Sequence, residues 1–282
     1  MKKKSFLLLI SITCLSLTQG FAKKTEKSAW EPGLHAYTFR VYTFMETVQK
    51  SQSLGLKYIE LYNGQRLGEG FDASEKLDFL NTDKATRNKI KKVLKDHGLT
   101  TVAIGVFSPR GRENWTTTFK FAKSMKIKMI NSEPAPEDIP IIDRLASKYK
   151  IKVAIHNRPE PSPYSDPQAI LNIVGSCGPY IGVCADIGHW IRSGMDPVEC
   201  IRKMKGHIFS LYLKDLNAKG KEAHDVPWGT GICPVESILK ELKEQKYNGF
   251  FPIRYEYNWT SSIPDIQQSI DYFYTVRNSI FP

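Results

Sequence analysis

Short apolar runs alternate with longer amphipathic segments along most of this chain. The runs are four to seven residues long, as expected for strands that are buried on both faces. They lie at residues 34–39, 58–62, 101–107, 128–131, 152–156, 181–184, 208–213 and 250–255. The segments between them have the period of about 3.6 residues that predicts amphipathic helices. These lie at residues 43–54, 83–97, 113–125, 139–149, 167–174, 197–203, 234–245 and 263–278.

Eight strand–helix units predict parallel strands joined by right-handed crossovers. In about 250 residues such units fit an α/β protein with a single closed (β/α)8 TIM barrel. Asp166 and Asp196, each followed by proline, are typical helix N-caps. A doubly wound open sheet is the alternative, but no G-x-G-x-x-G follows the first run. No linker rich in Gly, Ser or Pro divides residues 23–282, so we expect one domain there.

Residues 1–22 follow a different pattern. A basic KKK start precedes an apolar run at 6–17, and the small residues of GFA follow at 20–22. This combination predicts a cleavable signal peptide, and the run is too short for a stable membrane span. We therefore expect a mature chain that begins near Lys23, is periplasmic or secreted, and has no stable membrane insertion.

Composition narrows the class of protein further. A hydrophobic content of 41% with 24% charged residues is that of an ordinary globular domain, so disorder is not expected in the mature chain. The formal net charge of +11 is spread over helical segments without an arginine-rich stripe, so no nucleic-acid partner is expected. Cys177, Cys184, Cys200 and Cys233 show no C-x-x-C spacing, which disfavours a zinc knuckle. An oxidising compartment permits a disulfide, but the sequence does not give its pairing.

Polar side chains occur where the apolar runs end. In a barrel these ends meet at one mouth, where active sites lie. The carboxylates Glu133, Asp186 and Glu256 are therefore expected to converge there with His156. Carboxylate oxygens and imidazole together suit one divalent ion, either Mn²⁺, Co²⁺, Zn²⁺ or Mg²⁺. The alternative is an ion-paired rim without a metal.

Several motifs appear in a family-specific order. They are YIEL at 58–61, NSEP at 131–134, VAIHN at 153–157, CADIGH at 184–189, LKD at 213–215, GTG at 229–231 and YE at 255–256. In this order the mature chain resembles the sugar phosphate isomerase/epimerase superfamily of xylose-isomerase-like barrels, which also includes apurinic endonucleases. The motifs specify the superfamily and leave the substrate open.

The resemblance implies a metal site and its ligands. In the family's epimerases one metal is held by a Glu, an Asp, a His and a Glu on strands four, six, seven and eight. Three of these positions match Glu133, Asp186 and Glu256, and the two Glu residues would also shuttle protons. The strand-seven position carries Tyr212 in place of the histidine, and a neutral tyrosine is a poor ligand for these ions.

Another histidine can supply the missing metal ligand in two ways. His224, on the loop after strand seven, is the favoured replacement ligand. Alternatively His156 or His189 completes the coordination sphere with water. In a third interpretation the metal site has been lost, and His224 is an ordinary loop residue.

Further residues are assigned roles in substrate binding or proton transfer. Lys214 is expected to bind a sugar hydroxyl or stabilise an enolate oxygen, although it can instead pair with Asp215 or Asp186. His156 is expected to act in acid/base chemistry. The substrate-binding candidates are Tyr37, Glu60, Asn157, His189 and Trp228. Trp228, like Trp190, fits core packing equally well.

These residues predict an exported sugar isomerase or epimerase that abstracts a proton next to a carbonyl. The first alternative is a lyase or hydrolase that acts on 3-keto-glycosides by elimination. The second is a metal-free carbohydrate-binding barrel without catalysis, which Tyr212 favours. An endonuclease needs about three zinc ions, and six histidines in all supply too few ligands. The expected partner is a small carbohydrate, and assembly of identical subunits is compatible with this interpretation.

Overall fold

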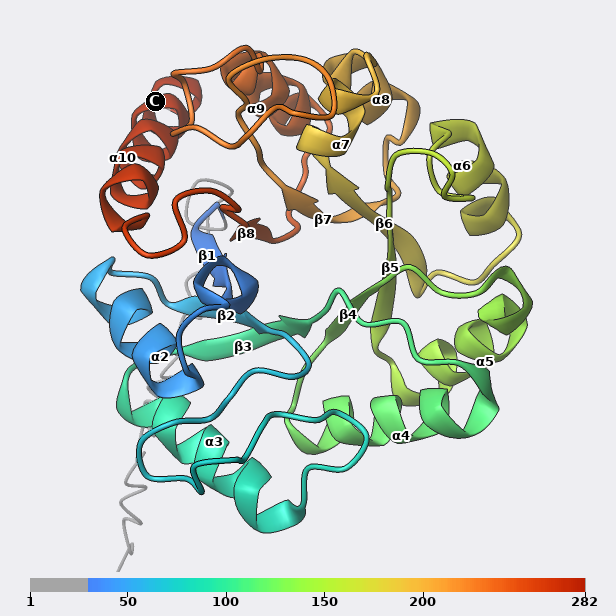
Figure 1. The fold of residues 1–282 in the computed structure, drawn as a ribbon. Helices are drawn as coiled ribbons and strands as arrows, with labels where there is room; N and C mark the ends of the chain where they lie inside the picture. Colours follow the sequence, from blue (N-terminus) through green and yellow to red (C-terminus); the bar gives the residue numbers. More distant parts are fainter. Residues whose placement is uncertain (1–29, 282) are drawn as a thin grey trace, which may run out of the picture.

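The computed structural model describes residues 30–281, and within them the chain forms the predicted barrel. Eight parallel strands follow one another around the sheet in chain order, with β8 next to β1. A parallel bridge between Ser210 and Phe250 joins β7 to β8 and closes the ring. Helices surround the strands on the outside (Figure 1). The predicted signal peptide lies outside the described residues.

The strands are short and buried, as the apolar runs predict. They are β1 (Pro32–His35), β2 (Tyr58–Leu61), β3 (Thr100–Ile104), β4 (Met129–Ser132), β5 (Lys152–His156), β6 (Ile181–Asp186), β7 (Ile208–Tyr212) and β8 (Phe251–Ile253). Small side chains such as Ala103, Ala154 and Cys184 line the barrel interior beside Met129 and Phe250. Between strands and helices, a much larger apolar core fills the outer layer. Burial of this outer layer is the main stabilising contribution to the barrel.

The predicted helices form with boundaries close to those expected. They are α2 (Phe44–Ser53), α3 (Lys84–Asp96), α4 (Gly111–Ser124), α5 (Ile139–Tyr149), α6 (Pro167–Gly175), α8 (Pro197–Lys203), α9 (Val235–Glu244) and α10 (Ile263–Ile280). Asp166 and Asp196 accept backbone N–H bonds at the starts of α6 and α8, each before a proline. Thr43 and Glu46 form a capping box at α2. Within residues 30–281, no helix is long and apolar enough to cross a membrane.

The first and last strands end earlier than their apolar runs. After His35 the chain turns into the 3-10 helix η1 (Ala36–Phe39) instead of continuing the strand. Thr38 of η1 donates its hydroxyl to the carbonyl of Ile253 at 2.9 Å and accepts the N–H of Tyr255 at 3.1 Å. This side chain replaces the next rung of the β1–β8 ladder, so both strands stop and their following residues turn into the mouth.

Besides η1, two further short helices were not predicted from the pattern. The 3-10 helix η2 (Pro136–Asp138) leads into α5, and α7 (Ile187–Arg192) follows β6 directly. Asp186 caps α7 by accepting the N–H of His189 at 3.1 Å. The single turn of chain between these two residues places both side chains at the mouth. The cysteines Cys177, Cys184, Cys200 and Cys233 are all free thiols.

Candidate active site

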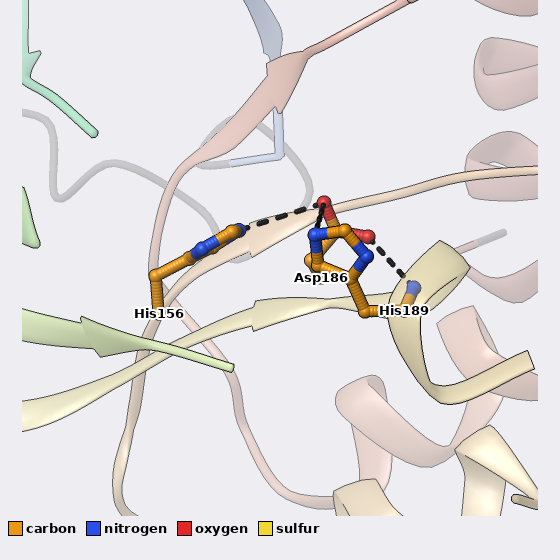
Figure 2. A group of neighbouring side chains, drawn as sticks. All are labelled: His156, Asp186 and His189. Carbon is orange, nitrogen blue, oxygen red and sulfur yellow. Dashed lines mark hydrogen bonds and ion pairs between the residues drawn. The ribbon is translucent and has the colours of Figure 1, made fainter. Parts of the chain in front are cut away.

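A buried His–Asp–His cluster lies at the carboxyl ends of β5 and β6 (Figure 2). Asp186 Oδ2 is 3.5 Å from His156 Nε2 and 3.8 Å from His189 Nε2. Asn157 fixes the backbone of Asp186, because its amide accepts the Asp186 N–H at 2.6 Å and donates to the Asp186 carbonyl at 3.0 Å. Burial lowers the pKa of His189 to about 4, so this imidazole is neutral. Asn157 therefore braces the site, and its amide is not free for substrate.

Glu133 and His156 form a hydrogen-bonded dyad beside this cluster. His156 Nδ1 donates to Glu133 Oε1 at 2.8 Å, and Arg158 reaches the same carboxylate at 3.1 Å. Burial raises the pKa of Glu133, but the bond from His156 and the charge of Arg158 outweigh it, so the pKa is lowered. Glu133 is 19% exposed, whereas His156 is only 1% exposed. The dyad therefore presents an ionised carboxylate to the mouth with a buried imidazole behind it.

Lys214 is a buried ammonium held by two carboxylates. Its Nζ is 2.6 Å from Asp225 Oδ2 and 2.9 Å from Glu256 Oε2. Burial lowers the pKa of Lys214, but the charges of Asp225 and Glu256 outweigh it and raise the pKa. Asp225 lies on the loop after β7 and Glu256 follows β8. The alternative pairing of Lys214 with Asp215 or Asp186 is therefore wrong.

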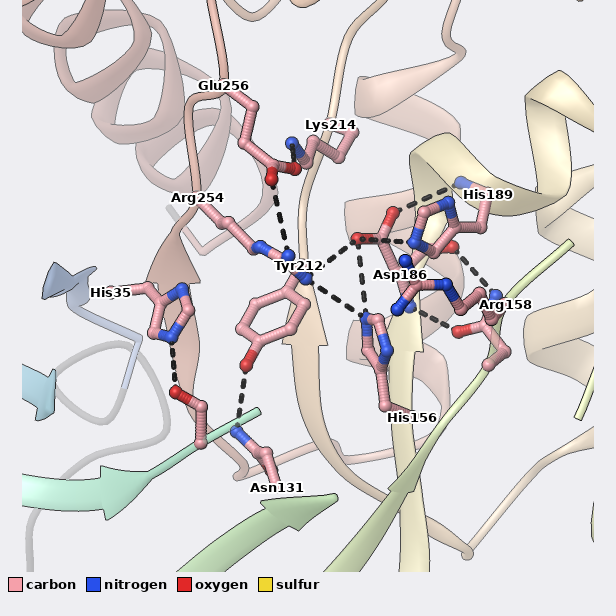
Figure 3. Close-up of polar contacts among 12 residues, drawn as sticks. His35, Asn131, His156, Arg158, Asp186, His189, Tyr212, Lys214, Arg254 and Glu256 are labelled. Atoms are coloured by element: carbon pink, nitrogen blue, oxygen red, sulfur yellow. Dashed lines mark hydrogen bonds and ion pairs between the residues drawn. The ribbon is translucent and has the colours of Figure 1, made fainter. Parts of the chain in front are cut away.

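Arg254 occupies the centre of the mouth (Figure 3). Its Nη2 is 3.2 Å from Glu256 Oε1, and its Nη1 is 3.8 Å from Asp186 Oδ2 and 3.4 Å from His156 Nε2. The guanidinium lies over the ring of Tyr212, with 5.3 Å between its carbon and the ring centroid. The side chain is only 14% exposed. A permanent cation of the protein thus stands between carboxylates at the ends of β6 and β8, the two strands that flank β7.

A second polar layer lies beneath this mouth. Glu60 Oε1 accepts hydrogen bonds from Tyr212 at 2.9 Å and from Asn131 at 2.8 Å. His35 Nε2 donates to the carbonyl of Gly105 at 2.7 Å, and its ring stacks on Tyr212. Burial raises the pKa of Glu60 to about 7 and lowers that of His35 to about 3. Glu60 is completely buried. It therefore supports Tyr212 from below and does not face a substrate.

The buried carboxyl of Glu60 predicts a pH-dependent stability. Its pKa rises from 4.5 when unfolded to about 7 when folded, so the folded state binds the proton more tightly. Stability is therefore fully present below about pH 4.5 and falls as pH rises towards 7, by about 3 kcal/mol. Urea denaturation from pH 4 to pH 8 should show this decrease in the wild type. Glu60→Gln should lack this component, and equal slopes for both proteins would contradict the assignment.

An open cavity of about 1310 Å³ leads from the surface to these groups. Glu133, His189 and Glu256 contribute to its wall, with Arg158 and Trp259 nearer the rim. The ring of Tyr37 packs edge-on against Trp259. Tyr37 therefore lies at the mouth as expected, although its contact with substrate stays a prediction.

Asp215 organises the loop that carries Asp225. Its two oxygens accept four backbone N–H bonds at 2.9 Å each, from Leu216, Gly229, Gly231 and Cys233. A Cβ at Gly231 would lie 2.3 Å from Asp215 Oδ1, so only glycine permits this approach. The paired LKD motif therefore has two separate tasks. Lys214 faces the mouth, while Asp215 ties the loop to the barrel wall.

Two expected positions are corrected by the structure. His224 stacks on Tyr257 with 4.0 Å between ring centroids and is not part of the His–Asp–His cluster. Trp228 is 3% exposed, donates its indole N–H to the carbonyl of Leu213, and packs against Phe273. A sugar ring cannot stack on it, because the indole is covered by the protein. Trp190, at 1% exposed, is equally buried.

The predicted ligand set does not assemble as one metal site. Among the described residues, the group with metal-compatible spacing is His156, Asp186 and His189, whose ligand atoms lie within 4.8 Å of one another. Glu133 and Glu256 are each engaged by protein cations instead. Asp186 Oδ2 is buried without a hydrogen-bond partner, which favours a cation at this point. Arg254 already approaches that oxygen, so the donor set fits a guanidinium better than a divalent ion.

Arg254, Asp225 and Trp259 were not assigned roles from the sequence. The sequence does contain a signal for Arg254, because this cation interrupts the last apolar run two residues before Glu256. A charged residue inside such a run indicates a polar environment at the strand end. Asp225 sits on a long loop, whose path back to Lys214 no local pattern indicates. Trp259 follows β8 among polar residues and resembles an ordinary surface aromatic.

Comparison with known proteins places this geometry in a family. The model of the family described as xylose isomerase-like TIM barrel matches residues 48–276. An uncharacterised protein from Parabacteroides distasonis ATCC 8503 has a similar structure, with 33% identity, a TM-score of 0.72, and coverage of 86% of this chain and 98% of that chain. No sequence among the curated proteins matches.

Two more distant structures share the fold. A xylose isomerase-like TIM barrel protein from Mycobacterium smegmatis, solved in complex with magnesium, has 14% identity and a TM-score of 0.71 over 91% of this chain and 99% of that chain. A D-tagatose 3-epimerase-like protein has 14% identity and a TM-score of 0.67 over 90% and 100%. The family model covers most of the barrel, and the first structure shares a third of its residues with this chain. This chain therefore belongs to the xylose isomerase-like TIM barrel family.

Proposed function

We propose that this protein is a carbohydrate-active enzyme that removes a proton from the carbon next to a carbonyl. The observation that carries this proposal is the Glu133–His156 dyad, whose carboxylate lines the cavity together with Glu256, the carboxylate that Lys214 and Arg254 hold. A base on one side and cations on the other are what enolate formation requires. Membership of a family with isomerases and epimerases supports a small carbohydrate as the substrate.

Glu133 is the base in this scheme. Its carboxylate takes the proton, and the electrons of the broken C–H bond move to the carbonyl oxygen, which becomes an enolate. Lys214 and Arg254 donate hydrogen bonds to that oxygen. His156 has a partner at Nε2 whether the imidazole is charged or neutral. When Nε2 carries a proton, Asp186 can accept it in a hydrogen bond, and when Nε2 is bare, Arg254 can donate to it. His156 can therefore change between its neutral and charged forms behind Glu133 and still remain paired.

Single-base chemistry is better supported than two-base epimerisation. Glu256 was expected to be the second proton shuttle, but both of its oxygens are engaged, one by Lys214 and the other by Arg254. Burial raises the pKa of Glu256, but the charges of Lys214 and Arg254 outweigh it and lower the pKa to about 2, so Glu256 holds no proton to donate. Glu133 faces a single arginine, Arg158. Glu133 then returns the proton itself, as in aldose–ketose isomerisation.

Elimination from a 3-keto-glycoside is the second candidate reaction. It begins with the same proton abstraction, after which the enolate expels the group on the neighbouring carbon. The cavity of about 1310 Å³ favours it, since pockets for single small ligands span roughly 300–1,000 Å³. The extra room suits a substrate that still carries its glycosidic partner.

A metal-assisted version of either reaction is not part of the proposal, because Arg254 already approaches Asp186 and His156 in the described group with metal-compatible spacing. Export to the periplasm or beyond belongs to the proposal and rests on the N-terminal sequence pattern alone. The mass of the purified mature protein tests it, because removal of residues 1–22 leaves Lys23 as the first residue.

Hydrogen exchange at carbon tests the proposed function directly. The purified protein is incubated in D₂O with free ketoses, aldoses and 3-keto-glycosides, and NMR follows each C–H next to the carbonyl. Deuterium incorporation supports proton abstraction, and release of the aglycone identifies elimination. Binding of a sugar without exchange in any member of the panel would instead support a carbohydrate-binding barrel without catalysis.

A further inference from the structure

Four protein cations balance the four carboxylates of the mouth. Every one of these carboxylates has a lysine or arginine nitrogen within 4 Å. The shortest such pairs are Arg158–Glu133 at 3.1 Å, Arg254–Asp186 at 3.8 Å, Lys214–Asp225 at 2.6 Å and Lys214–Glu256 at 2.9 Å, and Arg192 adds a contact to Asp225 at 3.4 Å. From the sequence, Glu133, Asp186 and Glu256 were interpreted either as ligands of one divalent ion or as an ion-paired rim without a metal. The observed ion pairs favour the second interpretation, because the described residues already supply the positive charge.

Arg254 stands beside the point where an added cation would bind. Its Nη1 approaches His156 Nε2 at 3.4 Å and Asp186 Oδ2 at 3.8 Å, on two of the three residues that would hold an ion in this cluster. Its Nη2 holds Glu256, one of the ligands expected from the sequence. A guanidinium cannot lose its proton in a protein, so its charge would always oppose a nearby divalent ion.

Tyr212 fits a guanidinium better than it fits a metal. Arg254 lies above the ring face of Tyr212, where the quadrupole of the ring attracts a cation. The hydroxyl of Tyr212 points away from Arg254 and donates a hydrogen bond to Glu60. It is therefore not directed at the His–Asp–His cluster. The tyrosine in place of the expected histidine thus supports Arg254 from below.

We propose that Arg254 and Lys214 together replace the divalent ion as the electrophile of this site, and that the protein uses no catalytic metal. Their ligand is the carbonyl oxygen of the substrate, which gains negative charge as Glu133 takes the proton. The two cations lie on either side of Glu256, so an oxygen bound beside that carboxylate meets hydrogen-bond donors from both. The catalytic part of this proposal rests on the proposed function, whereas the absence of a bound metal does not.

Metal titration without substrate tests the proposal. Mn²⁺, Co²⁺ and Zn²⁺ are each titrated by calorimetry into protein that has been stripped with EDTA. The wild type is expected to bind none of them stoichiometrically. Arg254→Gln removes the opposing charge and frees Asp186, so its metal affinity is expected to rise at least about 100-fold over that of the wild type. Arg158→Gln is the matched control, since it removes a cation of the mouth that lies away from Asp186, and no gain is expected.

Each result decides the question. One ion per wild-type chain, lost in Asp186→Asn, would overturn the proposal even if Arg254→Gln failed to fold. Unchanged carbon–hydrogen exchange in Arg254→Gln would overturn the role of the guanidinium as electrophile. EDTA-resistant exchange in the wild type, together with its loss in Arg254→Gln, supports the whole proposal. If no substrate exchanges at all, the proposed function fails, but the titration still decides whether the site binds a metal.

Discussion

Glu133→Gln is expected to reduce carbon–hydrogen exchange by about a thousandfold, the usual contribution of a general base. Glutamine has nearly the same shape and can still accept the hydrogen bond from His156, but it cannot take a proton from carbon. The substrate should bind with similar affinity, because the pairing of Lys214 and Arg254 with Glu256 is untouched. The effect should therefore fall on kcat and leave KM within a few-fold.

The control for this experiment is Glu137→Gln. Glu137 lies close to Glu133 in the chain, on η2, but it is highly exposed and only 3.7 Å from the equally exposed Arg110. Its loss should leave exchange unchanged, since an exposed pair of this kind contributes little. Exchange in Glu133→Gln that stays within tenfold of the wild type would remove Glu133 as the base. His156 would then be the next candidate.

Asp215→Ala is expected to lower the free energy of unfolding by about 4 kcal/mol. The substitution leaves four backbone N–H groups of the loop after β7 without their acceptor, and alanine offers no replacement. Water can reach some of these donors at the loop surface, so the cost stays below the sum of four separate losses. Chemical denaturation followed by far-UV circular dichroism measures the change.

Asp196→Ala is the reference variant, against which the loss of unfolding free energy in Asp215→Ala is compared. Asp196 also accepts two backbone N–H bonds, but it caps α8 at an exposed position, so about 1 kcal/mol is expected. A similar small loss in Asp215→Ala would mean that the loop does not depend on this carboxylate. In the expected case Asp225 also moves, because the same loop carries it. The pairing of Lys214 should then weaken along with the stability.

The order of the barrel elements could be predicted because it depends on local patterns. Apolar runs and amphipathic segments alternate clearly, and the predicted helices at 139–149 and 197–203 have the observed boundaries. The ends of strands were less certain, because an apolar run can continue beyond the last ladder bond. At β1 and β8 the side chain of Thr38 ends the pairing, and its contact with Ile253 spans most of the chain. No local pattern contains that information.

The sequence predicted where the site lies, but it did not predict which side chains contact one another there. The switch from apolar to polar residues identified Glu133, His156, Asp186 and Lys214 at strand ends, and the structure brings these four to one mouth. The partner of each depended on loop geometry. Lys214 pairs with Asp225 because Asp215 folds the loop back over the mouth, and Arg254 reaches Asp186 over the end of β7, where it lies above Tyr212. The sequence left the choice between a metal and an ion-paired rim open, because it does not give the positions of these cations.

The closure of the barrel involves the same charges as the site. β7 and β8 meet through one bridge between Ser210 and Phe250, whereas other neighbouring strands share registers of two or more residues. Above this seam, Lys214 from the β7 side binds Glu256 from the β8 side. A ligand that draws the ammonium away from Glu256 must therefore also loosen the join between β7 and β8. Ligand binding at the mouth and local opening between β7 and β8 are thus thermodynamically linked. Each changes the free energy of the other by the same amount.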